Sequence, residues 1–105
     1  MKKPLTTTEV EDVLRAHPEW MLKDGRLVRE WTFSDFPAAI AFVNRIAAIA
    51  EDAGHHPDID IRYNHVSLAL VSHDAGGITE RDATMAARIT AELANSASPI
   101  APFPL

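Results

Sequence analysis

The segment GHHPDIDIRYNHVSLALVSH, residues 54–73, gives the clearest indication of the fold. Apolar and polar side chains alternate over residues 58–63, which is the period-two pattern of a half-buried β-strand. Asn64 and His65 are suited to turning the chain, and a second alternation follows over residues 66–72. The second run is less polar on its outer face, as expected of a strand with neighbours on both sides. We therefore predict an antiparallel hairpin whose second strand is central in a sheet.

A helix is predicted immediately before this hairpin. Asp35 precedes Pro37 in a first turn, the pattern runs from Ala38 to about Ala53, and Gly54 is placed to cap the end. Its apolar arc is wide, which indicates deep burial or a partner surface. The arc consists of one stripe, Ile40, Val43, Ala47 and Ala50, with Phe42, Ile46 and Ile49 beside it.

The N-terminal third repeats the order of helix and hairpin. Thr6 and Glu9 form a capping-box pattern that begins a helix, and His17-Pro18 ends it. Two strand-like runs then flank Asp24-Gly25, a strong hairpin signal. In the second run one face is predicted to be core, with Arg29 as its only charged member; this face consists of Leu27, Arg29, Trp31 and Phe33.

The C-terminal part is predicted to be one helix and a tail. Thr79 and Asp82 have the spacing of a helix start, and the apolar positions that follow are Met85, Ala86, Ile89 and Leu93. We expect an α+β fold of order α-β-β-α-β-β-α, in which three helices pack on one face of an antiparallel four-stranded sheet. Residues 1–95 should form one domain, and the Pro-rich residues 96–105 an extended tail.

Composition excludes several classes of function. The chain has 105 residues, a formal net charge of -5 and no cysteine. The negative charge argues against direct nucleic-acid binding, and the absence of cysteine excludes disulfides, thiolate zinc sites and cysteine nucleophiles. No apolar run is long enough for a signal peptide or a membrane span. A cytoplasmic protein is expected.

Histidine is the main chemical signal of the sequence. His55 and His56 precede one strand and His73 follows its partner, so an antiparallel hairpin brings all three to one end of the sheet. Imidazole has an unperturbed pKa of about 6.5 and exchanges protons near neutrality, so we expect acid–base chemistry. Glu51 is either a solvated helix residue or a carboxylate that orients an imidazole. Local hydrogen bonding of each histidine is the simpler alternative.

A zinc site is a second alternative for the same residues. The three histidines with a carboxylate from Asp58, Asp60 or Asp74 have suitable ligand types. Adjacent side chains of an extended segment point to opposite faces, however, so His55 and His56 are poorly placed to bind one ion. We expect no metal and no other cofactor.

The spacing of these residues resembles a known family signature. Glu51, three further residues, His55-His56-Pro57, then Tyr63, His73 and Asp82 resemble the signature of the pterin-4a-carbinolamine dehydratases. The similarity extends from about Leu5 to Leu93. It implies a hydro-lyase that converts 4a-hydroxytetrahydropterin, released by aromatic amino acid hydroxylases, into quinonoid dihydropterin and water.

The resemblance also implies roles and partners. His55, His56 and His73 match the catalytic histidines, and Glu51 and Pro57 of the signature are expected to bind the substrate. Asp60 and Ser72 are added to the expected substrate-binding residues because of their places on the hairpin. Asp82 is interpreted as the helix cap only. A homodimer or homotetramer is expected, with a functional link to an aromatic amino acid hydroxylase and no membrane partner. The alternative within the same family is a protein-interaction module, a coactivator or assembly factor with little catalysis.

Overall fold

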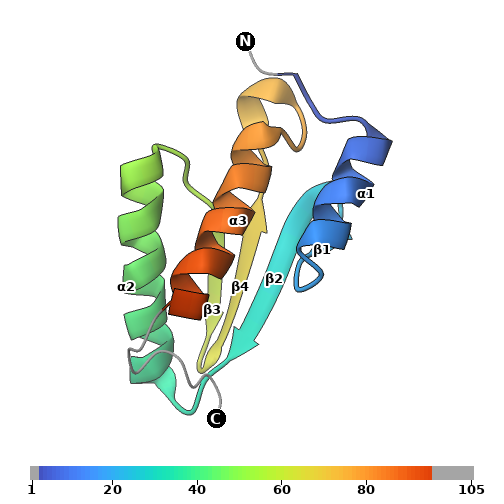
Figure 1. The fold of residues 1–105 in the computed structure, drawn as a ribbon. Helices are drawn as coiled ribbons and strands as arrows, with labels where there is room; N and C mark the ends of the chain where they lie inside the picture. The colour runs from blue at the N-terminus through green and yellow to red at the C-terminus, as the bar shows by residue number, and fades with distance from the viewer. Residues whose placement is uncertain (1–2, 96–105) are drawn as a thin grey trace.

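The computed structural model describes residues 3–95 and confirms the predicted α+β fold. Figure 1 shows the helices on one face of a twisted sheet. The strand order is β1-β2-β4-β3, and every neighbouring pair is antiparallel. The elements are α1 (Thr7–Ala16), β1 (Met21–Lys23), β2 (Arg26–Thr32), α2 (Phe36–Ala53), β3 (Asp58–Arg62), β4 (His65–Leu70), the short 3₁₀ helix η1 (His73–Ala75) and α3 (Glu80–Asn95). The predicted tail lies outside the described residues.

The second hairpin matches its predicted form, with β4 between β2 and β3. Asp58 is opposite Ala69 in the β3–β4 pair, and Trp31 is opposite Val66 in the β2–β4 pair. The turn comes one residue earlier than predicted: it is formed by Tyr63 and Asn64, and Tyr63 has a φ of 54°. Tyr63 is therefore an exposed turn residue and not part of the half-buried face.

The helix ends follow the sequence signals. The Thr6 side chain and Glu9 form the complete capping box of α1, with His17 at its C-terminal end. The Asp35 side chain accepts from the Ala38 amide at the start of α2, and Gly54 ends that helix in the left-handed conformation. These contacts satisfy backbone groups that helix ends leave without partners, which explains why the boundaries were predictable.

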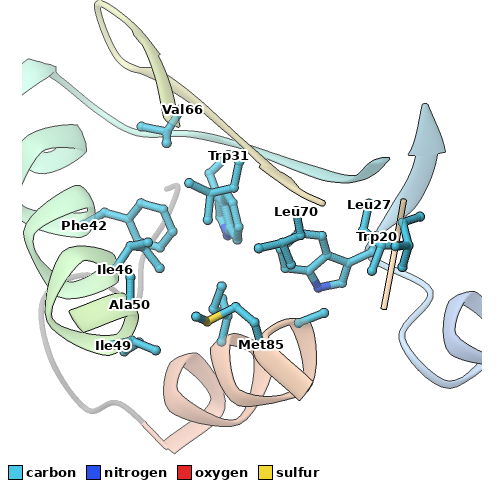
Figure 2. Packing of buried hydrophobic residues seen from close by; sticks show 14 of the residues in the cluster. Trp20, Leu27, Trp31, Phe42, Ile46, Ile49, Ala50, Val66, Leu70 and Met85 are labelled. Atoms are coloured by element: carbon cyan, nitrogen blue, oxygen red, sulfur yellow. The ribbon is translucent and has the colours of Figure 1, made fainter. Parts of the chain in front are cut away.

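The core lies between the sheet and the helices. In Figure 2, Phe42 of α2 and Met85 of α3 point toward Trp31 and Leu70 of the sheet. Trp20 and Trp31 are buried and meet edge to face, with ring centroids 6.3 Å apart. None of the described helices has the length and apolar character that crossing a membrane requires.

The core covers only part of the predicted apolar arc of α2, and Ala50 is the buried member of its stripe. Phe42, Ile46 and Ile49 are buried, whereas Ala47 is exposed and Val43 is only half-buried. The arc is too wide for all of it to face the sheet. The larger side chains, Phe42, Ile46 and Ile49, take the buried positions. Part of the arc is therefore left outside the core.

The face of the sheet opposite the helices is charged. It carries a groove of about 390 Å³ lined by side chains from every strand, including Lys23, Glu30, Asp60, Arg62 and His65. Arg62 lies 3.2 Å from Asp60, and His65 lies 3.6 Å from Glu30. This groove lies on the other side of the sheet from the buried core.

Candidate functional site

The candidate site lies at the end of the sheet where β3 begins and β4 ends. Residues 55–57 connect the C-terminal end of α2 to β3, and η1 follows β4 after a short link. Because Asp58 is paired with Ala69, the chain before β3 and the chain after β4 leave the sheet at the same end. The hairpin brings His55-His56 and His73 to this end, as the sequence indicated.

His55 is directed toward the interior. Its side chain is 12% exposed, and its Nε2 lies 2.5 Å from Oδ1 of Asp82, which is fully buried in the first turn of α3. A buried carboxylate requires polar partners to offset its loss of hydration. His55 and Asp82 therefore form a histidine–carboxylate pair that joins the end of α2 to the start of α3.

Asp82 has further partners at its other oxygen. Oδ2 accepts the Ser72 hydroxyl at 2.8 Å and the Thr79 amide N–H at 2.9 Å. The Ser72 and Thr79 hydroxyl oxygens are 2.8 Å apart. All three residues are buried, at 2% exposure or less. The predicted capping role of Asp82 is confirmed by the Thr79 contact, but it is incomplete because the same carboxylate also binds His55.

His56 points away from His55. Its side chain is 64% exposed, and its Nε2 lies 2.9 Å from Oε2 of Glu51 in the last turn of α2. The two adjacent histidines therefore have different carboxylate partners on different elements, as expected for neighbouring side chains of an extended segment. The Glu51 side chain is itself 80% exposed, so it is a solvated helix residue that also contacts an imidazole, and both interpretations of Glu51 remain open.

His73 is exposed in η1, and the residues before and after it, Ser72 and Asp74, are held by hydrogen bonds. Ser72 pairs with Gly77 through two backbone hydrogen bonds of 3.0 and 3.3 Å. Asp74 accepts a hydrogen bond from the Arg81 guanidinium at 2.5 Å. This hydrogen bond holds the pKa of the Asp74 carboxyl below its ordinary value.

A cavity of about 320 Å³ lies beside His55, between the end of α2 and the first turns of α3. Its lining residues are Ala53, His55, Glu80, Arg81, Thr84, Met85 and Arg88. Arg88 is paired with Asp52 at 2.8 Å and Arg81 with Asp74, so both guanidinium groups have acidic partners. Neither His56 nor His73 lines this cavity. Within residues 3–95, no three histidine or acidic side chains converge in a way that would hold a metal ion.

The expected substrate-binding residues separate into two groups. Glu51, Pro57 and Ser72 lie at the histidine end of the sheet, with Ser72 buried and Pro57 half-buried. Asp60 lies in the groove on the opposite face of the sheet, next to Arg62. The structure therefore does not bring Asp60 to the histidines.

Two contacts of this site were missed at the level of sequence. The Asp82–His55 pair joins residues far apart in the chain, and the capping pattern gave Asp82 a sufficient local explanation. The Arg81–Asp74 pair had no periodic signal, although both residues flank the predicted loop. The end of the hairpin and the start of α3 are joined by a short loop. This short connection was the one sequence feature that could have indicated contacts between the two segments.

The fold and these pairs define a small antiparallel α+β protein with histidine–carboxylate pairs at one end of its sheet. Residues 3–92 match the family model described as pterin 4 alpha carbinolamine dehydratase. A protein of Acidobacterium capsulatum is 58% identical over 89 residues, covering 85% of this chain and 97% of its own. A protein of Chloroflexus aurantiacus is 54% identical over 85 residues, covering 81% and 91%. Both are provisionally named pterin-4-alpha-carbinolamine dehydratases. The chain belongs to the pterin-4a-carbinolamine dehydratase family.

Solved structures agree with this assignment. A Brucella melitensis protein described as a transcriptional coactivator/pterin dehydratase is 37% identical, with a TM-score of 0.77 over 85% of this chain and 97% of that one. A pterin dehydratase-like protein described as a RuBisCO assembly factor in the alpha-carboxysome is 27% identical. Its TM-score is 0.54, over 69% of this chain and 83% of that one. Solved proteins of this fold are thus described as a coactivator/dehydratase and as an assembly factor.

Proposed function

We propose that this chain catalyses the dehydration of 4a-hydroxytetrahydropterin to quinonoid dihydropterin in pterin recycling. The observation that supports this most directly is the pairing of two adjacent histidines with separate carboxylates, His55 with Asp82 and His56 with Glu51. The family assignment supplies the substrate class. The source of the substrate, on this proposal, is an aromatic amino acid hydroxylase.

The reaction needs only proton transfers from the protein. The bond between C4a and the hydroxyl oxygen breaks, N5 loses its proton, and a C4a–N5 double bond forms as water leaves. A base must accept the N5 proton and an acid must protonate the departing hydroxyl. Neutral imidazole serves as the base and imidazolium as the acid, each contributing about 10²–10⁴-fold.

The three histidines divide these tasks in our proposal. One of His55 and His56 accepts the N5 proton, and His73 protonates the departing hydroxyl. The exposure of His56 and His73 supports direct access to a substrate bound at this end of the sheet. Glu51 orients His56 and contacts the substrate together with Pro57 and the backbone near Ser72. Asp60 is left out of this assignment because it lies on the opposite face of the sheet.

The test is dehydration of chemically prepared 4a-hydroxytetrahydropterin by the purified full-length chain. His56→Ala and His73→Ala should each lower kcat by about 10²-fold or more, with little change in stability because both side chains are exposed. His17→Ala and His65→Ala are matched controls, since they remove imidazoles at the end of α1 and on the opposite face of the sheet. Wild-type turnover in both site variants would refute the assignment, as would equal losses in the controls.

A protein-interaction role is the second candidate. It is favoured by the coactivator and assembly-factor descriptions of the two solved relatives. It is also favoured by the part of the α2 apolar arc that the core leaves uncovered, which includes Ala47. Absence of dehydration by the wild-type chain, together with binding of a partner protein, would support this role over catalysis. Light scattering of the same sample would show whether the partner is a second copy, as a homodimer or homotetramer requires.

A further inference from the structure

The first turn of α3 contains a buried polar network whose hydrogen-bond directions can be assigned. As a carboxylate, Asp82 can only accept hydrogen bonds, so the hydrogen in each of its contacts belongs to the partner. The single hydroxyl hydrogen of Ser72 is directed to Asp82, so the hydrogen between Ser72 and Thr79 comes from Thr79. The Thr79 hydroxyl oxygen in turn accepts the Arg81 amide N–H at 3.1 Å.

The same reasoning fixes the tautomer of His55. Its Nε2 faces Asp82 Oδ1 at 2.5 Å and must carry the hydrogen in that contact. When the ring is neutral, Nδ1 therefore has the lone pair. Nδ1 makes no hydrogen bond to another part of residues 3–95. His55 lines the cavity between the end of α2 and the first turns of α3.

We propose that Asp82 is a positioning residue that holds His55 as the Nε2–H tautomer and leaves Nδ1 as the atom that exchanges a proton with the substrate. This rests on the proposed function only in its last clause, because the tautomer is a property of the free protein. A buried carboxylate that orients an imidazole acts in this way in other acid–base sites.

The start of α3 also contacts the segment around His73, residues 72–74. Asp82 and Thr79 hold Ser72, which precedes His73, and Arg81 holds Asp74, which follows it. The residues on both sides of His73 are thus attached to the turn that orients His55. His55 and the residues on both sides of His73 thus share hydrogen-bond partners at the start of α3.

The Asp82→Asn variant should change neutral His55 from the Nε2–H to the Nδ1–H tautomer, and the hydrogen bonds of Asp82 explain why. Asp82 Oδ2 accepts two hydrogens, from Ser72 and Thr79, so the amide oxygen of asparagine must take that position. The amide nitrogen then faces His55 and donates to Nε2. The remaining hydrogen of a neutral His55 moves to Nδ1, the atom that should be free to accept a proton.

The experiment is NMR of the full chain with ¹⁵N-labelled histidine, recorded across the titration of His55. The wild type should have its hydrogen on Nε2 in the neutral form, and Asp82→Asn should have it on Nδ1. In the dehydration assay, Asp82→Asn should lower kcat by about 10²-fold, and the double variant with His55→Ala should be no slower than the slower of the two single variants. Asp52→Asn is the matched control, because it removes one exposed negative charge from the end of α2 and does not contact His55.

The outcomes separate this proposal from the proposed function. The positioning role is overturned if neutral His55 of the wild type carries its hydrogen on Nδ1. This test uses the wild-type chain alone, so it does not depend on whether a variant folds. An unchanged tautomer in folded Asp82→Asn, or a reversal in Asp52→Asn, overturns it as well. If the expected tautomers are found but the wild type does not dehydrate the pterin, the tautomer assignment stands and the proposed function fails.

Discussion

Replacing Gly54 by alanine tests how the end of α2 directs the chain into the two adjacent histidines. Gly54 caps α2 with φ 68° and ψ 26°, in the left-handed region, and its N–H donates to the Ala50 carbonyl. His55 follows at once, and its own N–H also reaches the Ala50 carbonyl at 3.2 Å. The direction in which His55 and His56 leave the helix is therefore set at this residue.

The cost of the substitution follows from the backbone alone. A Cβ added at Gly54 meets nothing within 4 Å, so no steric clash contributes. The left-handed conformation costs an L-residue about 1–2 kcal/mol, and the smaller entropy of unfolded alanine offsets about 0.4–1 kcal/mol of this. The net loss is about 1 kcal/mol, which lowers the Tm of a domain of this size by roughly 4–8 °C.

Activity should fall by more than stability explains. Relief of the strained turn shifts the histidines, and a displacement of about 1 Å at a catalytic group costs up to about 10²-fold in rate. Gly25→Ala is the matched control: Gly25 has a φ of 75°, an added Cβ also meets nothing within 4 Å, and it lies in the turn of the first hairpin. Circular dichroism melts and the dehydration assay should give both variants similar Tm losses, with slower turnover only in Gly54→Ala. A wild-type Tm in Gly54→Ala, or equal activity losses in the two variants, would refute this reasoning.

Two further predictions concern the core and the loop of His73. Leu68 is fully buried, so Leu68→Ala should lower the free energy of unfolding by about 2–5 kcal/mol, whereas Leu22→Ala, at an exposed position, should change it by less than about 0.5 kcal/mol. Urea unfolding measures both, and equal effects would contradict the assignment of the core. The pKa of Asp74 lies below its ordinary 3.8 in the folded chain, because the Arg81 guanidinium donates a hydrogen bond to the carboxylate. The ion pair therefore stabilises the fold fully at pH values above 3.8. This contribution is lost as the pH falls through the lowered pKa of the folded state. Asp74→Asn should therefore lose less stability than the wild type in melts from about pH 5 to about pH 2, and identical losses would contradict the pairing.

Local signals made most of the fold predictable. The capping box of Thr6 and Glu9, the Asp24-Gly25 turn and the alternation in β3 and β4 each specify a conformation within a few residues. The central position of β4 also followed from its apolar outer face. Such features depend on backbone hydrogen bonds and on local side-chain packing, which the sequence displays directly.

The rest depended on contacts between distant segments. The register of β2 against β4, which sets Trp31 opposite Val66, has no local signal. The apolar arc of α2 was too wide to show which line of residues faces the sheet. Asp82 was assigned to a cap because three residues of sequence explained it, whereas its contact with His55 appears only when α3 lies against the end of α2.

The alternation of side chains along a strand determines on which face of the sheet Asp60 and Ser72 lie. Asp60 is paired with Ser67, which alternates with the buried Val66 and Leu68, so Asp60 belongs to the face opposite the helices. Ser72 is in phase with Val66 and Leu68 and belongs to the helix face, where it meets Asp82. The two residues thus lie on opposite faces of the sheet, and the alternation of the sequence already contains this distinction.

The topology also explains why one helical turn reaches both histidine segments. The chain before β3 and the chain after β4 leave the sheet together, and only residues 76–79 separate η1 from α3. A link this short keeps the first turn of α3 beside the sheet end from which it came. The direction of α3 is fixed by Met85 and Ile89, which are buried in the core. Apolar packing of α3 against the sheet therefore sets the position of Asp82, and through it the orientation of the His55 ring.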